Sequence, residues 1–329
     1  MKALVFEKSG LESLELREVP NPSVGDTDVR IAVKMASVNP VDIMSVESLK
    51  VYPIPHIPGS EFFGVVEEVG KKVSHVSPGD RVAVYTRLFD GTCRSCLRGD
   101  QTYCKAGKRI GVESQGGYAE EIVVPGTNVV RSDLPDEILA SLPIAMLTPY
   151  HALKSAGVSS SDVVVVVGAS GNTGMFAVQL GKLLGATVIA ISAKPWVKEL
   201  GADYVLDYQE AEEAVREITF GDMASVVVNS LGGKYWDLSL RLLGNHGRLV
   251  TFGSLTGGNV NLNINDIYLK HASIIGTNRG SMGDLMELLK IAGKLQVRTW
   301  KVFPLEQGRF AMEQFKSSDR KGRIFIRIN

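Results

Sequence analysis

The sequence has few cysteines, no excess of charge of either sign and no long hydrophobic run. Three cysteines occur among 329 residues, all between Cys93 and Cys104, so a general disulfide framework is excluded. Lys plus Arg and Asp plus Glu both number 36, which leaves no global field to attract nucleic acid or an anionic membrane. No apolar run reaches the roughly 18–20 residues of a membrane span, and Glu7 interrupts the N-terminus too early for a secretory signal. We expect a soluble, cytoplasmic protein that binds neither nucleic acid nor a membrane.

The length and composition indicate about two globular domains. Apolar residues make up 44% and charged residues 22% of the chain, which are values typical of folded proteins. From residue 1 to about residue 130, the apolar runs are short, rich in β-branched residues and separated by Pro and Gly, as at 29–33 and 81–84. This pattern predicts an all-β barrel or sandwich.

The pattern changes near Met146. Residues 163–167 are five consecutive valines, which is typical of a parallel strand buried on both faces. Helical and strand-like segments alternate after it and predict βαβ units in a parallel sheet. The predicted strands are 187–191, 225–228, 247–252 and 323–326, and the predicted helices are 175–184, 210–218, 235–243 and 284–292.

A glycine-rich loop follows the valine strand and leads into a helix. Because Gly171 and Gly174 have no Cβ, the backbone can turn tightly and the helix N-terminus can approach a pyrophosphate. Strand, loop, helix and second strand occur in the required order, so we predict a dinucleotide cofactor site rather than a purely structural turn. The loop residues predicted to contact the cofactor are Ser170, Gly171, Asn172, Thr173 and Gly174.

The end of the second strand predicts which nicotinamide cofactor binds. This strand is followed by Ser192 and Lys194, and no acid stands where an NAD enzyme would hold the ribose hydroxyls. A hydroxyl and an ammonium, with Lys198 as a helper, are suited to a 2′-phosphate. We therefore predict NADP(H), with NAD(H) as the alternative if Lys194 is only a solvated loop residue.

The three cysteines form a metal-binding pattern. Cys93, Cys96 and Cys104 supply three thiolates, and Asp90 precedes Cys93 by a further step of three residues. Four such ligands predict one closed, tetrahedral zinc site of the structural kind. The alternatives are a redox-active pair and a lobe that has lost its metal. Basic residues that would offset the charge of this site are Arg94, Arg98, Lys105 and Lys108.

These features together resemble the medium-chain dehydrogenase/reductase superfamily, which includes zinc alcohol dehydrogenases and quinone oxidoreductases. Besides the cysteine lobe and the glycine loop, the most specific matches are 59–73, 78–82, 200–203 and 322–323. The resemblance implies an α/β protein with a discontinuous GroES-like β-barrel domain, residues 1–145 and 278–329. A Rossmann doubly wound parallel-sheet domain, residues 146–277, would lie between these two segments in the sequence.

The resemblance also implies further contacts. The residues expected at the cofactor, in addition to the glycine loop, are Thr148, Asn229, Phe252, Gly253 and Arg323. Asn229 and Phe252 follow or end strands, at the carboxyl edge where sheets of this kind bind cofactors. A homodimer or homotetramer is implied as well, joined through the Rossmann sheet near residues 273–276.

One departure from the zinc alcohol dehydrogenases affects the predicted chemistry. Those enzymes hold a catalytic zinc with a Cys, a His and a later Cys or Asp, and the matching positions here are Asn39, Ser60 and Ile144. An amide, a hydroxyl and an alkyl chain cannot together hold Zn²⁺ at useful affinity. Only the neighbouring Glu61 keeps its identity. We therefore predict that the catalytic metal, and with it the Lewis acid, has been lost while the structural zinc remains.

The segment 38–42 is similar to the Asn-Pro-x-Asp segment of zinc-independent quinone and enoyl reductases. In some of these a tyrosine shortly afterwards positions or protonates the substrate, and Tyr52 is the matching candidate; alternatively, Tyr52 packs on a proline-rich loop. The predicted function is an NADPH-dependent reductase of quinones or activated C=C bonds (enone, 2-alkenal or enoyl thioester), with Asn39, Ser60 and Tyr52 as catalytic hydrogen-bonding groups. The alternatives are a zinc-type alcohol dehydrogenase or carbonyl reductase, with a metal held through Glu61, and a non-catalytic NADPH-binding protein.

Overall fold

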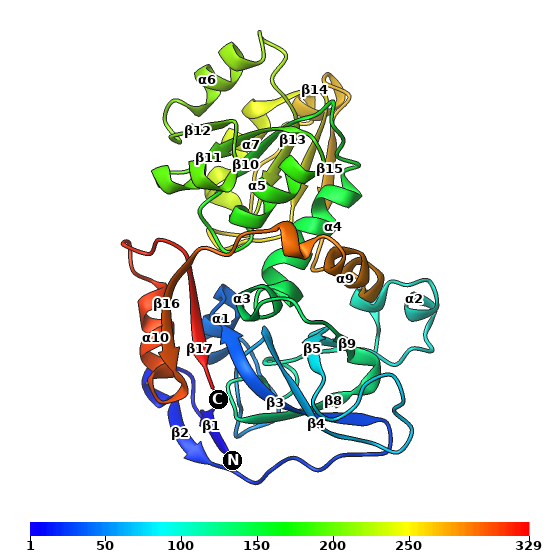
Figure 1. Ribbon diagram of the computed structural model, residues 1–329. Coiled ribbons are helices and arrows are strands. Elements are labelled where there is room, and N and C mark those ends of the chain that lie inside the picture. The colour runs from blue at the N-terminus through cyan, green and yellow to red at the C-terminus, as the bar shows by residue number, and fades with distance from the viewer. Residues whose placement is uncertain (329) are drawn as a thin grey trace. The chain divides into compact units, whose positions relative to one another are not determined.

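The computed structural model describes residues 1–328, which form two compact units (Figure 1). The first unit, here called the β domain, consists of Met1–Ile144 and the chain from Ser281 onward. The second, the αβ domain, consists of Ala145–Gly280. The sequence-based boundaries were placed after residues 145 and 277, and the structure divides after 144 and 280.

The β domain is built on a sheet of seven strands in the order β16-β17-β3-β4-β5-β9, with β8 also paired to β3. Its strands are β1 (Lys2–Val5), β2 (Glu15–Glu18), β3 (Asp28–Ser37), β4 (Phe62–Val69), β5 (Arg81–Val84), β6 (Arg87–Leu88), β7 (Lys108–Arg109), β8 (Glu121–Pro125), β9 (Val129–Arg131), β16 (Thr299–Pro304) and β17 (Arg323–Arg327). Its helices are α1 (Pro40–Glu47), α2 (Arg94–Leu97), α3 (Asp136–Leu139), α9 (Met282–Leu289) and α10 (Gly308–Phe315).

Strand β3 lies at the centre of this sheet, where it pairs with β17, β4 and β8. Every second residue at its start is apolar and faces the core. Val29, Ile31 and Val33 are completely buried and belong to one hydrophobic cluster. The C-terminal strand β17 pairs antiparallel with β3, with Phe325 opposite Ser37. Figure 1 shows the C-terminal strand β17 beside β3 from the first part of the chain, which accounts for a domain assembled from both ends of the sequence.

The αβ domain contains a parallel sheet of six strands in the order β12-β11-β10-β13-β14-β15. Its strands are β10 (Val163–Val167), β11 (Thr187–Ile191), β12 (Tyr204–Leu206), β13 (Ala224–Asn229), β14 (Leu243–Thr251) and β15 (Ser273–Gly276). Its helices are α4 (Leu147–Ser155), α5 (Gly174–Leu183), α6 (Ala211–Ile218), α7 (Trp236–Leu242) and α8 (Asn265–Tyr268). Counted along the chain, the strand order is 3-2-1-4-5-6, that of dinucleotide-binding doubly wound sheets, and it reverses between β10 and β13.

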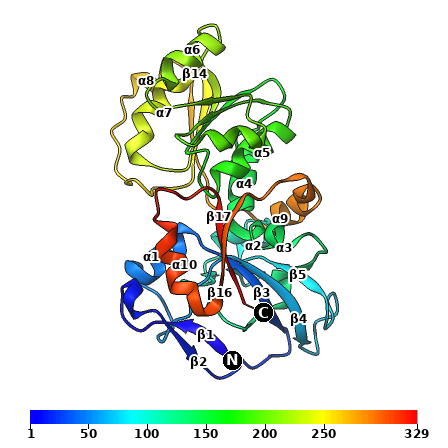
Figure 2. The same ribbon diagram turned by 60° about the vertical axis from the view of Figure 1, so that its left-hand side comes forward.

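Helices cover both faces of the parallel sheet (Figure 2). Val165 and Val167 of β10 pack in one cluster with residues of α6 and α7, whereas α4 and α5 lie on the opposite face. Four of the five valines of β10, all but Val163, are completely buried, as expected for a strand covered on both sides. The predicted α/β fold class is therefore confirmed.

Among the elements that the sequence did not predict are β12, β16 and α10. Only one of the six residues of β16 is buried and the strand carries Lys301, so it has little hydrophobic periodicity. The helix predicted at 284–292 starts earlier, because Ser281 Oγ accepts a hydrogen bond from the Asp284 amide (3.1 Å) and Ser281 N donates to Asp284 Oδ2 (2.9 Å).

In residues 1–328, no helix has the length and apolar character needed to span a membrane.

Candidate functional site

The glycine loop lies at the carboxyl end of β10, where the strand order reverses. Gly168 adopts φ +80°, a conformation that side chains disfavour. A Cβ at Gly174 would lie 2.2 Å from the Gly168 carbonyl oxygen, so only glycine fits where α5 begins. The loop thus presents the N-terminus of a ten-residue helix to the edge of the sheet, and this arrangement fits the pyrophosphate of a dinucleotide.

The loops after β13 and β14 lie at the same edge of the sheet. Asn229, predicted to contact the cofactor, is completely buried, and its Oδ1 accepts hydrogen bonds from the backbone of Leu231 and Gly232, both 2.9 Å. Asn229 therefore shapes this loop from within. A Cβ at Gly253 would lie 2.4 Å from the Ser230 carbonyl oxygen, so Gly253 allows the two loops to approach each other. Phe252 beside it is half-buried, and Thr148 is buried on α4.

A cavity of about 500 Å³ lies beyond the end of β11 and is lined in part by Ser192 and Lys198. Ser192 Oγ accepts a hydrogen bond from the Lys194 amide (3.0 Å), which holds the predicted phosphate-binding residues in one turn. Asp203 also lines the cavity, but its carboxylate is paired with Lys182 Nζ at 2.8 Å. That acidic group is therefore neutralised within the protein.

A second group of predicted residues meets around Glu61 in the β domain. Glu61 is completely buried, and its carboxylate accepts hydrogen bonds from Asn39 Nδ2 and the Ile144 amide, both 2.7 Å. The Arg323 guanidinium, also completely buried, donates to the same carboxylate at 2.5 Å. Four positions were compared above with the zinc alcohol dehydrogenases. One hydrogen-bonded cluster contains three of them, namely Asn39, Glu61 and Ile144.

Asp42, in the first turn of α1, connects the remaining residues. Its Oδ2 accepts a hydrogen bond from Asn39 N and its Oδ1 accepts one from Ser60 N, both 2.8 Å. Burial raises the pKa of Asp42 to about 6, and interactions with the Ser60 side chain and with these backbone amides oppose the rise. Burial also raises the pKa of Tyr118, which lies near Asp42. The sequence-based site did not include Asp42, although the Asn-Pro-x-Asp segment was a signal for it.

Two predicted site residues have surroundings that differ from their predicted roles. Arg323 was expected to reach the cofactor's pyrophosphate; in the structure it is completely buried, and its guanidinium donates to the Glu61 carboxylate. Tyr52 was expected beside Asn39 and Ser60, but it is 67% exposed and takes no part in the hydrogen bonds around Glu61 and Asp42.

The cysteine lobe brings all four predicted metal ligands together. The Sγ atoms of Cys93, Cys96 and Cys104 and a carboxylate oxygen of Asp90 all lie within 4.8 Å of one another. Hydrogen bonds from the amides of Cys93 and Thr92 lower the pKa of Asp90, which keeps it ionised. Ligand atoms around a tetrahedral zinc lie about 3.8 Å apart, so small side-chain movements complete the site. The donor set therefore fits a zinc ion.

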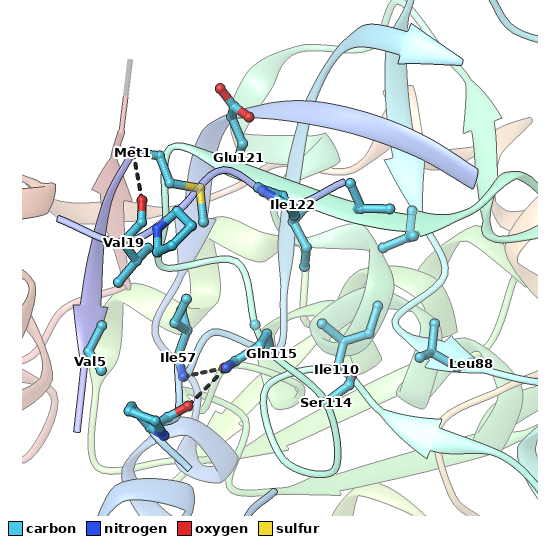
Figure 3. A pocket seen from close by; sticks show the side chains of 16 residues that line it. Met1, Val5, Val19, Ile57, Leu88, Ile110, Ser114, Gln115, Glu121 and Ile122 are labelled. Atoms are coloured by element: carbon cyan, nitrogen blue, oxygen red, sulfur yellow. Dashed lines mark hydrogen bonds between the residues drawn. The ribbon is translucent and has the colours of Figure 1, made fainter. Parts of the chain in front are cut away.

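A further cavity, of about 460 Å³, lies in the β domain (Figure 3). Its lining is mainly apolar and includes Val5, Ile57 and Ile122. The Gln115 amide crosses one side, where it accepts from Ile57 N and donates to Pro55 O. None of the predicted catalytic, cofactor or metal residues lines this cavity.

Comparison with known proteins covers both domains. Residues 25–136 match the alcohol dehydrogenase GroES-like domain, and residues 173–294 match the zinc-binding dehydrogenase family. The NAD-dependent alcohol dehydrogenase of Sulfolobus acidocaldarius is 30% identical over 100% of both chains. The acryloyl-coenzyme A reductase of Sulfurisphaera tokodaii is also 30% identical, over 99% of this chain and 100% of that one. A cobalt- and zinc-bound thermostable alcohol dehydrogenase from Pyrobaculum aerophilum is 42% identical, with a TM-score of 0.94 and 99% of each chain covered.

These matches agree with the geometry of the two domains. The αβ domain has the strand order and glycine loop of a nicotinamide cofactor site, and the cysteine lobe has a donor set that fits zinc. The chain belongs to the medium-chain dehydrogenase/reductase superfamily and is an NAD(P)(H)-dependent oxidoreductase of that type.

Proposed function

We propose that the protein is an NADPH-dependent reductase of quinones or activated C=C bonds, such as enones, 2-alkenals and enoyl thioesters, that works without a catalytic zinc. The observation that carries the proposal is the state of Glu61. Its carboxylate already accepts hydrogen bonds from Asn39, Ile144 and the cationic Arg323. A carboxylate engaged by three donors has little capacity left for a metal ion, and its neighbours supply neither a thiolate nor an imidazole.

The nicotinamide, when bound, supplies the hydride. The glycine loop and the N-terminus of α5 hold the pyrophosphate, and Ser192 and Lys194 hold the 2′-phosphate. Negative charge then develops on the carbonyl oxygen of the substrate and requires hydrogen-bond donors, because no Lewis acid is present in this proposal. The donor that we propose in the β domain is the hydroxyl of Ser60, which is buried and interacts with the Asp42 side chain. Because Tyr52 lies outside the buried cluster, water provides the final proton.

The preference for NADPH is tested separately. Replacing Lys194 with Ala removes one charge-assisted hydrogen bond, which corresponds to a loss of roughly 10–100-fold in kcat/KM for NADPH. The kcat/KM for NADH should stay within about twofold. The matched control is Lys316→Ala, which removes an exposed lysine paired with Glu47 in the β domain. Equal losses with both cofactors would contradict the assignment.

A zinc-type alcohol dehydrogenase is the second candidate, favoured by the 42% identical solved relative, which is a cobalt- and zinc-bound alcohol dehydrogenase. The two are distinguished by following NADPH oxidation with 2-cyclohexenone, benzoquinone and crotonyl-coenzyme A, against cyclohexanone. Metal content per chain is measured on the same preparation. Turnover of an enone, quinone or thioester with about one zinc supports the proposal. Turnover of the ketone alone with about two metal ions supports the alcohol dehydrogenase, and tight NADPH binding without any turnover supports a non-catalytic binding protein.

A further inference from the structure

Two exposed histidines are in contact in the αβ domain, toward the amino ends of β14 and β15, whereas the glycine loop lies at the carboxyl edge of the sheet. The ring centroids of His246, in β14, and His271, just before β15, are 5.3 Å apart, and the ring planes meet at 54°. Within residues 1–328, no hydrogen bond or ion pair joins either ring to another residue. Each neutral imidazole therefore has a nitrogen available to a ligand from solvent.

The backbone at both histidines has an uncommon conformation. φ is +55° at His246 and +51° at His271, in the left-handed region that most side chains avoid. Strand β14 also bulges relative to β13 between Leu243 and Arg248, and the His246 amide donates to the Lys270 carbonyl oxygen at 2.7 Å. Bulges and left-handed residues redirect side chains locally, and here they accompany two imidazoles at one point of the surface.

The basic residues nearest to the two histidines in the sequence are held by other groups. Lys270 Nζ donates to the Leu243 carbonyl oxygen at 2.7 Å. The Arg248 guanidinium forms an ion pair with Asp162 and donates to the Ala156 carbonyl oxygen at 2.6 Å. Both cations are therefore engaged with oxygen partners of their own, and the histidine pair supplies two neutral nitrogen ligands.

The spacing of the rings suits two ligands of one metal ion. An imidazole nitrogen lies about 2.0–2.1 Å from zinc, which places the ring centroid about 3.2 Å from the ion. Two such centroids at a tetrahedral angle are about 5.2 Å apart, and the observed separation is 5.3 Å. Imidazole suits zinc, nickel and copper, whereas magnesium and calcium prefer oxygen ligands.

We propose that His246 and His271 form a binding site for one divalent transition-metal ion of the zinc, nickel and copper class, with water completing the coordination. The bound ion joins β14 to β15, the edge strand of the sheet, and stabilises the αβ domain by mass action. The site is separate from the cysteine lobe and does not depend on the proposed function. Because 25 positions separate the two histidines, their spacing in the sequence gives no metal-binding motif.

The test titrates Ni²⁺ into the full chain by calorimetry at pH 8, after one equivalent of Zn²⁺ has been added to fill the cysteine lobe. The wild type should bind one Ni²⁺ per chain. His246→Asn and His271→Asn each remove one imidazole, and asparagine tolerates the left-handed backbone. Either variant should weaken Ni²⁺ binding roughly 100-fold or more, because the second ligand no longer acts at a high effective concentration. The double variant should lose little more, since the two imidazoles act as one unit.

The matched control is His75→Asn, which removes an exposed histidine of the β domain whose ring contacts the Gly126 carbonyl oxygen at 3.0 Å. This variant should bind Ni²⁺ within about twofold of the wild type. Absence of Ni²⁺ binding by the wild type, or binding that neither asparagine variant weakens, would overturn the proposal. A loss confined to one of the two variants would identify a single surface histidine instead, and one ion per two chains would place the ion between copies; either result also overturns it.

Thermal unfolding provides a second readout that does not rely on calorimetry. Ni²⁺ at 100 times its Kd should raise the Tm of the wild-type αβ domain by roughly 5–15 °C, because the ion binds only the folded pair. The two asparagine variants at the same Ni²⁺ concentration should shift by less than about 2 °C. Equal shifts in the wild type and the double variant would show that Ni²⁺ acts elsewhere on the chain and would refute the site.

Discussion

Replacing Arg323 with Met tests whether this arginine serves the fold or the cofactor. Arg323 and Glu61 are both completely buried and form an ion pair. Removal of the guanidinium takes the cationic partner away from the buried Glu61 carboxylate, while the neutral donors Asn39 Nδ2 and Ile144 N remain. An uncompensated buried charge typically costs about 3–5 kcal/mol. Because methionine retains much of the apolar volume, this electrostatic cost should dominate.

The expected shift in melting temperature follows from the size of the domain. The β domain has about 190 residues, and for domains of this size 1 kcal/mol shifts Tm by about 2–4 °C. Arg323→Met should therefore lower the Tm of the β domain by roughly 6–20 °C. The double variant Glu61→Gln/Arg323→Met, which removes both charges, should recover most of the loss.

Circular dichroism follows unfolding, and fluorescence titration at 20 °C gives the Kd for NADPH. The control is Arg309→Met, which breaks an exposed pair with Glu313 on α10 and should cost less than about 1 kcal/mol. If Arg323 serves the fold, the Kd for NADPH stays within about threefold. An unchanged Tm with a Kd for NADPH raised 10-fold or more would refute this reasoning and would show that Arg323 contributes to cofactor binding.

Three further predictions concern the metal, the pH and the oligomer. Cys96→Ser should reduce zinc from about one ion per chain to nearly none by elemental analysis, and zinc retained at the wild-type level would contradict the lobe assignment. The pKa of Asp42 is about 6 in the folded protein against an ordinary 3.8, so the folded state binds this proton more tightly and stability falls as the pH rises from about 4 to 6. The urea-unfolding free energy of wild type minus that of Asp42→Asn should therefore decrease by roughly 3 kcal/mol over this range, whereas a constant difference would disprove the burial effect. We also propose that two copies pair through β15, the last strand of the six-stranded sheet, where Ile274 is 36% exposed; Ile274→Lys should then sediment as a monomer, and an unchanged sedimentation coefficient would exclude this edge.

Features that depend on short stretches of sequence could be predicted. The valines of β10 identify a strand covered on both faces because burial on both sides demands an uninterrupted apolar run. The glycine loop was predictable because Gly174 must approach the Gly168 carbonyl, a constraint between residues six positions apart. The cysteine spacing predicted a lobe in which the four ligand atoms do come together.

The partners of the buried charges could not be predicted in this way. Arg323 follows Glu61 by 262 residues, and the two meet because β17 pairs with β3 and β3 pairs with β4. Tyr52 follows the Asn-Pro-x-Asp segment closely in sequence, yet it is exposed. Strand pairing, and not proximity along the chain, therefore sets which side chains share a low-dielectric interior.

The sequence alone determined the fold class, the glycine loop of a nicotinamide cofactor site and the four side chains that come together in the cysteine lobe, because each depends on local periodicity, turn chemistry or residue spacing. Only the tertiary structure decided that Glu61 is engaged by Asn39 and Arg323, and that Asp42 holds Ser60. The physical reason is that a buried polar group must find a partner within hydrogen-bonding distance, and folding fixes which groups lie within that distance.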